Sequence, residues 1–179
     1  MVIKTSRFGL VELKSEDVLT FPEGILGFQH LRQFVLLDDP NDDIFAWLQS
    51  CELPGIAFPV LEPELFGHKY AVNLNRTDLE SLKLNVDQAP GYLAIVTIPD
   101  DATEMTANIK APIVINMKDR LARQCVLQDN NLAIKEKIFT KLQSRVVQNP
   151  QTPIKSQGRQ FDIAVKVSEP SKPALEQEL

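Results

Sequence analysis

The stretch FVLLDDPNDDIFAWLQSCELPGIAFPV, residues 34–60, indicates the fold class of the chain. It contains three short, largely apolar runs, 34–37, 45–49 and 56–60, each about as long as one β-strand. Asp, Asn, Pro and Gly fill the segments between the runs, and these residues favour turns because they preset or tolerate turn backbone angles. The stretch therefore predicts three consecutive short strands joined by turns.

The same pattern continues on both sides of this stretch. Further strands are predicted at residues 2–5, 10–13, 18–21, 69–74, 92–98, 113–116 and 124–127. Short strands at such even spacing favour a barrel or sandwich over a parallel α/β sheet. One helix is expected near Asp78–Leu84, because Thr77 and Glu80 have the spacing of a capping box. The sequence thus predicts a mostly β fold, a small β-barrel-like single domain with a short helix and an extended C-terminal tail.

The region after residue 131 fits two different structures. Ile134, Ile138, Leu142 and Val146 recur every four residues, which predicts an amphipathic helix that ends before Pro150. Residues 132–138 also alternate between apolar and polar side chains well enough for a final strand. We favour the helix and keep the strand as the alternative.

The chain divides into a barrel-like domain over residues 1–146 and a linker-like extension over residues 147–179, which is rich in Pro, Ser and Gln. Within the extension, Phe161, Ile163, Val165 and Val167 alternate with more polar residues, so a strand is possible at 160–168. An isolated strand is unstable in water. This segment is therefore expected to pair with its own barrel, to pair with another chain, or to stay disordered.

The formal net charge of −5 hides an uneven distribution. Residues 1–103 carry 16 acidic and 7 basic side chains, whereas residues 104–179 carry 8 acidic and 12 basic ones. The stretch 33–68 has no Lys or Arg, and its acidic residues are Asp38, Asp39, Asp42, Asp43, Glu52, Glu62 and Glu64. Such a stretch repels nucleic acid and attracts basic partners, although it also fits a solvated face that only keeps the protein soluble.

No set of residues has the pattern of a catalytic or metal site. The chain lacks a phosphate-binding loop, a dinucleotide-binding fingerprint, a zinc-protease motif and a nucleophile elbow. Cys51 and Cys125 lie among apolar neighbours and are expected to be buried free thiols, and His30 and His68 are expected at the surface or in turns. The two aspartate pairs lack the alternating spacing of a calcium loop. We therefore expect no enzyme, no cofactor and no metal.

Nothing in the sequence predicts an association with membranes. The chain does not begin with a cationic segment followed by an apolar one, as a secretory signal does, and no apolar run approaches the roughly 20 residues that span a bilayer. Hydrophobic residues make up 44% of the chain, enough for a real core. The expected location is the cytoplasm.

Three blocks of sequence resemble the FliW family of flagellar assembly factors. Residues 21–28, FPEGILGF, resemble the family's F-P-x-G-[IL]-x-G-F signature, and residues 45–50, FAWLQS, resemble its aromatic-x-W-L-Q-S strand. Residues 106–116, TANIKAPIVIN, are similar to its T-x-N-L-x-A-P-[IL]-x-[IL]-N segment. The resemblance spans about residues 1–142, and the tail departs from it. The motif residues, whose role we take as mainly structural, are Phe21, Pro22, Gly24, Gly27, Phe28, Trp47, Gln49, Asn108, Pro112 and Asn116.

The resemblance implies a protein that acts by binding. Members of this family bind flagellin and also CsrA, a dimeric regulator that represses translation of flagellin messenger RNA, and the two partners compete for them. The acidic residues expected to meet such a partner are Asp38, Asp39, Asp42, Asp43, Glu62 and Glu64. Direct contact with nucleic acid is not expected. An RNA-binding barrel and a small hydrolase remain the alternatives, and the oligomeric state and the surface used by each partner stay open.

Overall fold

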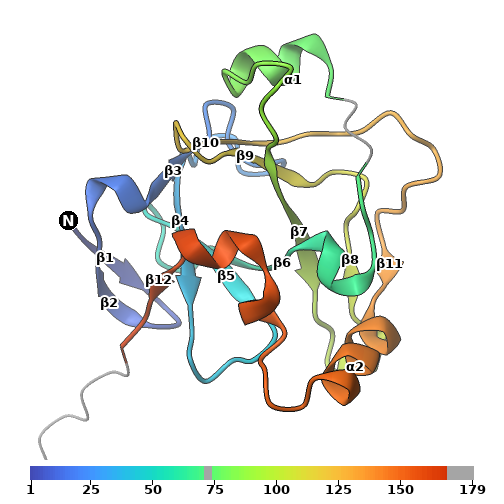
Figure 1. The fold of residues 1–179 in the computed structure, drawn as a ribbon. Coiled ribbons are helices and arrows are strands. Elements are labelled where there is room, and N and C mark those ends of the chain that lie inside the picture. Colours follow the sequence, from blue (N-terminus) through green and yellow to red (C-terminus); the bar gives the residue numbers. More distant parts are fainter. Residues whose placement is uncertain (71–73, 169–179) are drawn as a thin grey trace, which may run out of the picture.

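A closed barrel of seven strands forms the body of the protein, in the computed structural model that describes residues 1–70 and 74–168. The order around the barrel is β7-β6-β5-β4-β3-β10-β9, and β9 pairs again with β7 (Figure 1). The barrel strands are β3 (Val18–Thr20), β4 (Gln33–Asp38), β5 (Ala46–Ser50), β6 (Ala57–Leu61), β7 (Gly91–Thr97), β9 (Ile113–Asn116) and β10 (Leu121–Gln124). All neighbouring pairs are antiparallel except β3 and β10. The expected mostly β, barrel-like fold is confirmed.

The remaining elements lie around the barrel. The other strands are β1 (Val2–Thr5), β2 (Gly9–Glu12), β8 (Thr106–Ala107), β11 (Glu136–Lys137) and β12 (Val165–Lys166). The helices are α1 (Arg76–Ser81) and α2 (Phe139–Gln148), with the 3-10 helices η1 (Ser15–Asp17), η2 (Pro63–Phe66), η3 (Ala102–Glu104), η4 (Lys155–Gln157) and η5 (Arg159–Ile163). In Figure 1, α1 lies at one end of the barrel and the turn between β4 and β5 lies at the opposite end.

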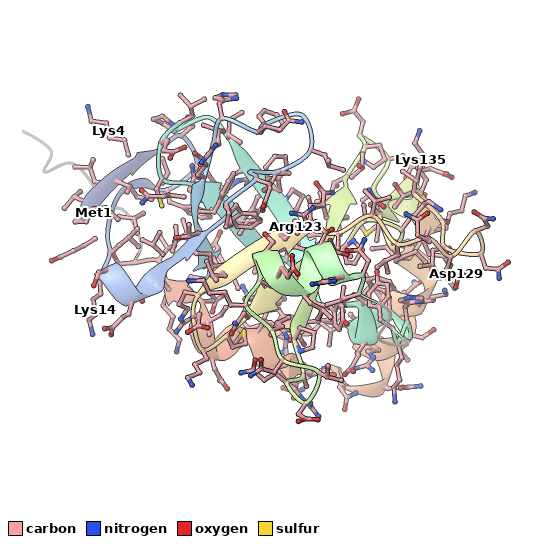
Figure 2. All side chains as sticks on the ribbon, turned by 90° about the horizontal axis from the view of Figure 1, so that it is seen from above. Met1, Lys4, Lys14, Arg123, Asp129 and Lys135 are labelled. Carbon is pink, nitrogen blue, oxygen red and sulfur yellow. The ribbon has the colours of Figure 1, made fainter. Side chains whose placement is uncertain are left out.

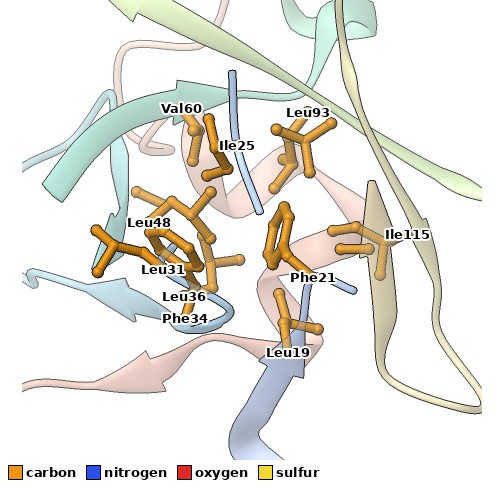
Figure 3. Packing of buried hydrophobic residues seen from close by; sticks show 13 residues of the cluster. Leu19, Phe21, Ile25, Leu31, Phe34, Leu36, Leu48, Val60, Leu93 and Ile115 are labelled. Atoms are coloured by element: carbon orange, nitrogen blue, oxygen red, sulfur yellow. The ribbon is translucent and has the colours of Figure 1, made fainter. Parts of the chain in front are cut away.

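The barrel is filled by side chains from every strand and by the loop that joins β3 to β4. This loop places Phe21, Ile25 and Leu31 among the buried residues of the largest core cluster (Figure 3). The Phe21 ring is fully buried and packs edge-on against Phe34, with 5.0 Å between ring centroids. Burial of each such side chain stabilises the fold by about 1.5–3 kcal/mol.

Two glycines give this loop its shape. Gly24 and Gly27 have φ angles of +67° and +85°, in the left-handed region where a side chain is strained. A Cβ on Gly24 would also lie 2.6 Å from the backbone Cα of Gln29, whereas a Cβ on Gly27 would meet nothing within 4 Å. The signature FPEGILGF therefore encodes a turn that directs its apolar side chains into the barrel.

A second apolar cluster lies outside the barrel. The β1–β2 hairpin covers the outer face of β4 and β5, where Val35, Leu37 and Trp47 pack against Ile3 and Val11. Trp47 is only 8% exposed, so it belongs to this outer core. The β4 and β5 strands are consequently apolar on both faces, which is why residues 34–37 and 46–48 show no polar alternation.

Most predicted strands agree with the observed ones to within a residue, but one strand and the first helix are shifted further. The strand expected at 124–127 is β10, Leu121–Gln124, because Pro112 has no N–H to donate and the ladder with β9 ends at the Gln124–Ile113 pair. The helix expected near Asp78–Leu84 is α1, and its N-cap is Asn75 rather than Thr77: the Asn75 side chain accepts a hydrogen bond from the Asp78 N–H.

The region after residue 131 contains both of the structures that its pattern allowed. Glu136 and Lys137 form the short strand β11, paired with β8, and the helix α2 begins only at Phe139. The strand predicted at 69–74 falls partly on residues 71–73, outside the described residues, and its described residues are not in a strand. The strand predicted at 160–168 is present only as β12, because residues 159–163 form η5 instead.

We expect Gly24→Ala to destabilise the fold by about 2–5 kcal/mol, because it adds a backbone clash to the strain of a left-handed residue. Gly27→Ala is the matched control, since it carries the same strain without the clash and should cost about 1–2 kcal/mol. Urea unfolding of both variants measures the difference. Equal losses of stability would show that the close approach of Gln29 does not constrain the loop.

Candidate functional site

The first group of acidic residues forms the turn between β4 and β5. The Asp39 Oδ1 atom accepts a hydrogen bond from the Asn41 N–H at 2.9 Å. The Asp42 Oδ1 atom accepts from the N–H groups of Ile44 and Phe45, each at 2.9 Å. These carboxylates therefore shape the turn, in which Asp39 and Asp42 are partly exposed and Asp43 is exposed.

The second group lies at the start of η2, directly after β6. Glu62 is only 7% exposed, and its carboxylate accepts hydrogen bonds from the backbone N–H groups of Arg159 at 2.8 Å and Gln160 at 2.5 Å. Burial raises the pKa of the Glu62 carboxyl, and the two N–H donors oppose this shift. Glu64, two residues further on, is exposed.

The tail of the chain lies between the two groups. The Lys155 ammonium pairs with the Asp38 carboxylate at 2.7 Å and also donates to the Asp39 carbonyl, while the tail residues that follow meet Glu62. Arg145 of α2 donates to the Glu64 carbonyl at 3.1 Å and to the Gln157 side chain at 3.2 Å. We call the six residues Asp38, Asp39, Asp42, Asp43, Glu62 and Glu64 the acidic surface.

The acidic surface is not free of cations in space, although the stretch 33–68 contains none in sequence. Its four outward members are Asp39, Asp42, Asp43 and Glu64, whereas Asp38 and Glu62 face the tail inside the molecule. Of the hollows that flank the tail, two adjoin the acidic surface. One, of about 220 Å³, is lined partly by Asp39 and Val167, and the other, of about 390 Å³, is lined partly by Glu62, Glu64, Tyr70 and Arg159.

The motif residues at 47–49 have roles within the fold. The Gln49 side chain is fully buried, and its amide donates to the carbonyls of Ser50, Leu53, Pro54 and Ile56 at 3.0–3.5 Å, which fixes the turn between β5 and β6. The Arg7 guanidinium lies 3.5 Å from the centre of the Trp47 ring.

The third motif also holds turns together. Asn108 accepts from the Ala111 N–H at 3.0 Å, directly before Pro112. The buried Asn116 amide donates to the Leu82 carbonyl at 2.8 Å, so it ties the end of α1 to the barrel. These residues therefore stabilise the fold and do not belong to the acidic surface.

Sequence reasoning missed one charged cluster. Arg123 on β10 pairs with Asp78 of α1 at 2.9 Å and with Glu23 of the β3–β4 loop at 3.1 Å, and Ser81 donates to Glu23 at 2.7 Å. Figure 2 shows Arg123 beside α1. The four residues come from three segments that are far apart in sequence, and no local pattern indicates that they meet. The Asp78 side chain is 6% exposed, so this cluster fastens α1 to the barrel.

The described residues contain neither a cluster of metal-binding side chains nor a membrane-spanning helix. In residues 1–70 and 74–168, no three His, Cys, Asp or Glu side chains are grouped closely enough to hold a metal ion. Over the same ranges, no helix has the length and apolar character needed to cross a membrane.

The cysteines and histidines lie in settings that do not favour nucleophilic chemistry. Cys125 is fully buried, whereas Cys51 is partly exposed, so the expectation of a buried thiol holds for Cys125 alone. Burial raises the pKa of the Cys51 thiol to about 11 and raises that of Cys125 further. His68 packs edge-on against the Tyr70 ring, 4.4 Å between centroids, and burial lowers its pKa. His30 is exposed.

Comparison with known proteins gives the same family as the three sequence blocks. The model of the FliW protein family matches residues 2–138. The chain belongs to the FliW family. A FliW flagellar assembly factor of Bdellovibrio bacteriovorus is 67% identical over 167 residues, which cover 93% of this chain and 95% of that protein.

More distant FliW proteins match the barrel but less of the chain. A flagellar assembly factor FliW of Ruminiclostridium cellulolyticum is 33% identical over 148 residues, 82% of this chain and 100% of its own length. The crystal structure of a flagellar assembly factor FliW superimposes with a TM-score of 0.71 at 34% identity, and covers 78% of this chain and 97% of that one. The FliW barrel therefore occurs with and without a long C-terminal extension.

We expect both thiols to react slowly with a chromogenic disulfide reagent at pH 8. Because burial raises its pKa to about 11, Cys51 should hold roughly 100-fold less thiolate than an ordinary cysteine, and Cys125 should react more slowly still. The rates in native protein and in urea give the comparison, and Cys51→Ala isolates the signal of Cys125. A native thiol that reacts faster than the unfolded chain would support the hydrolase alternative.

Proposed function

We propose that this protein is a flagellar assembly factor that acts by binding flagellin and the translational regulator CsrA in the cytoplasm, without catalysis. Membership of the FliW family and the 67% identity to a protein of that name support the flagellar role. In this scheme flagellin and CsrA compete for the protein. Secretion of flagellin frees the protein, which then occupies CsrA and lifts the repression of flagellin synthesis.

The acidic surface is the observation that carries the CsrA part of the proposal. A protein that binds RNA presents cations to the phosphates, and an acidic neighbour lowers the local positive potential without filling the RNA site. The turn between β4 and β5 projects Asp39, Asp42 and Asp43 at one end of the barrel, and Glu64 lies across the tail from them. Docking of this end beside the RNA path would weaken RNA binding.

The reach of this effect is short. Near physiological salt the screening length is about 8 Å, so only acidic side chains close to the RNA path contribute. Asp43 and Glu64 are exposed, whereas Asp38 and Glu62 are already paired with the tail. The outward members should therefore have the larger effect on RNA binding in the protein as it stands.

We expect the double change Asp39→Asn and Asp43→Asn to preserve the fold, since Asn can keep the oxygen that accepts from Asn41, and to weaken the antagonism of CsrA. Association with CsrA should slow by roughly 3- to 10-fold at low salt, because surface charges act mainly on the association rate. Competition binding with labelled flagellin leader RNA measures the antagonism.

The matched control is Glu80→Gln with Asp87→Asn, which removes two acidic charges in and just after α1, at the opposite end of the barrel. This variant should compete with RNA as the unchanged protein does. If both double variants shift the RNA competition curve equally, total charge rather than the acidic surface is responsible. If the unchanged protein at saturation leaves RNA affinity unaltered, the CsrA role is wrong.

A further inference from the structure

The segment Ile154–Val167, here called the docked tail, covers part of the acidic surface through three kinds of contact. Lys155, only 4% exposed, supplies a cation to Asp38. The N–H groups of Arg159 and Gln160 bind the Glu62 carboxylate at 2.8 and 2.5 Å. Beyond them, β12 runs parallel to β4, and the Val167 N–H donates to the Asp38 carbonyl at 2.9 Å.

Apolar contacts accompany these polar ones. Ile154 is 1% exposed within the cluster beneath α2, and Val167 is 9% exposed beside Trp47 in the outer core. Phe161 and Ile163 are partly buried against the barrel core. In Figure 1 the docked tail crosses the front of the barrel from α2 to β12.

The surface beneath the docked tail has the features of a site for an extended peptide. It offers one carboxylate to a cation, a second carboxylate to two successive N–H groups, an edge of β4 to a short strand, and apolar contacts between them. Addition of a strand to a free sheet edge is a common mode of peptide binding. Charge makes this site selective for a cationic segment.

The docked tail has little internal structure to hold it in place. Its elements are two 3-10 helices and a strand of two residues, and ordering each residue costs about 1–2 kcal/mol. That cost is offset mainly by contacts with the barrel and with α2, because the hydrogen bonds within the tail are short-range turns. Segments of this kind open locally without global unfolding, so the site beneath can exchange occupants.

Shorter relatives show that the barrel does not require this tail. The FliW family model ends at residue 138, before the docked tail begins. The Ruminiclostridium protein is matched over its full length by 148 residues of this chain, so it lacks an extension of this length. The docked tail is therefore an addition to a barrel that is complete without it.

We propose that the docked tail is a tethered occupant of a docking site for an extended cationic segment of a protein partner, and that the partner must displace it to bind. The identity of that partner, CsrA, comes from the proposed function, whereas the docking site itself is inferred from the contacts of the tail. A tethered segment acts at an effective concentration in the millimolar range, so it sets a threshold that the partner's affinity must exceed. The tail thus tunes how readily the acidic surface is engaged.

The first test uses a labelled peptide of residues 152–168 and needs no partner. It is added to the unchanged full chain and to a full chain whose own tail is released by Lys155→Met and Val167→Pro. We expect binding to the released chain and at least about 100-fold weaker binding to the unchanged chain, because the tethered tail competes. Equal binding to both chains, or binding to neither, overturns the proposal.

Matched peptides separate a specific site from general charge attraction. Lys155→Met and Lys166→Met each remove one cation, but Lys155 is buried against Asp38 whereas Lys166 is exposed. The Lys155→Met peptide should bind at least about 10-fold more weakly, since its contact is buried and charge-assisted, and the Lys166→Met peptide should bind as the original does. Equal losses in the two peptides would overturn the proposal.

The second test follows hydrogen exchange in the unchanged full chain, which does not depend on the released variant folding. The Gln160 and Val167 amides, bound to Glu62 and Asp38, should lose protection when purified CsrA is added. CsrA that binds without this loss overturns the inference and leaves the proposed function standing. If CsrA does not bind at all, the CsrA role fails, and the peptide test alone decides the inference.

Discussion

Phe21 packs edge-on against Phe34 inside the barrel, and this contact anchors the loop that follows β3 next to the shortest ladder of the barrel, where β3 and β10 share only one pair, Thr20 with Leu121. Contacts from the loop supplement that ladder: the Gln124 side chain of β10 accepts a hydrogen bond from the Leu26 N–H at 3.0 Å, and Arg123 pairs with Glu23 at 3.1 Å. The loop after β3 compensates by filling the barrel with apolar side chains, and Gly24 lets the chain turn back close to Gln29. The seam, the core and the signature motif are thus one structural unit.

Local sequence predicted most of the fold, since short apolar runs between turn residues have few other uses. The prediction was wrong where the end of an element is set by pairing with another strand or by a proline that has no backbone N–H to donate. Pro112 ends the β9–β10 ladder, and pairing with β8 delays the start of α2 to Phe139. In the tail, Glu62 binds the first N–H groups of η5, and that contact from about a hundred residues away turns an alternating pattern into a 3-10 helix.

The candidate site was predictable only in part. The acidic stretch was visible in the sequence, but a count along the chain cannot show that Asp38 and Glu62 face the tail. The buried Lys155 lies in a segment whose composition is typical of a linker. The ion pair between Arg123 and Asp78 was also not predictable, because it forms only when β10 packs against α1. Charges brought together by tertiary structure decide which acidic side chains remain available.

The parallel seam between the barrel strands β3 and β10 also has a consequence for synthesis. Thr20 cannot pair until Leu121 has been synthesised, about a hundred residues later. At a translation rate of roughly 5–20 residues per second, this interval is about 5–20 s. During that time the nascent chain can form the β4–β5–β6 meander, whose contacts are local, but not the barrel. The barrel can therefore close only after β10 has been synthesised, long after the meander can form.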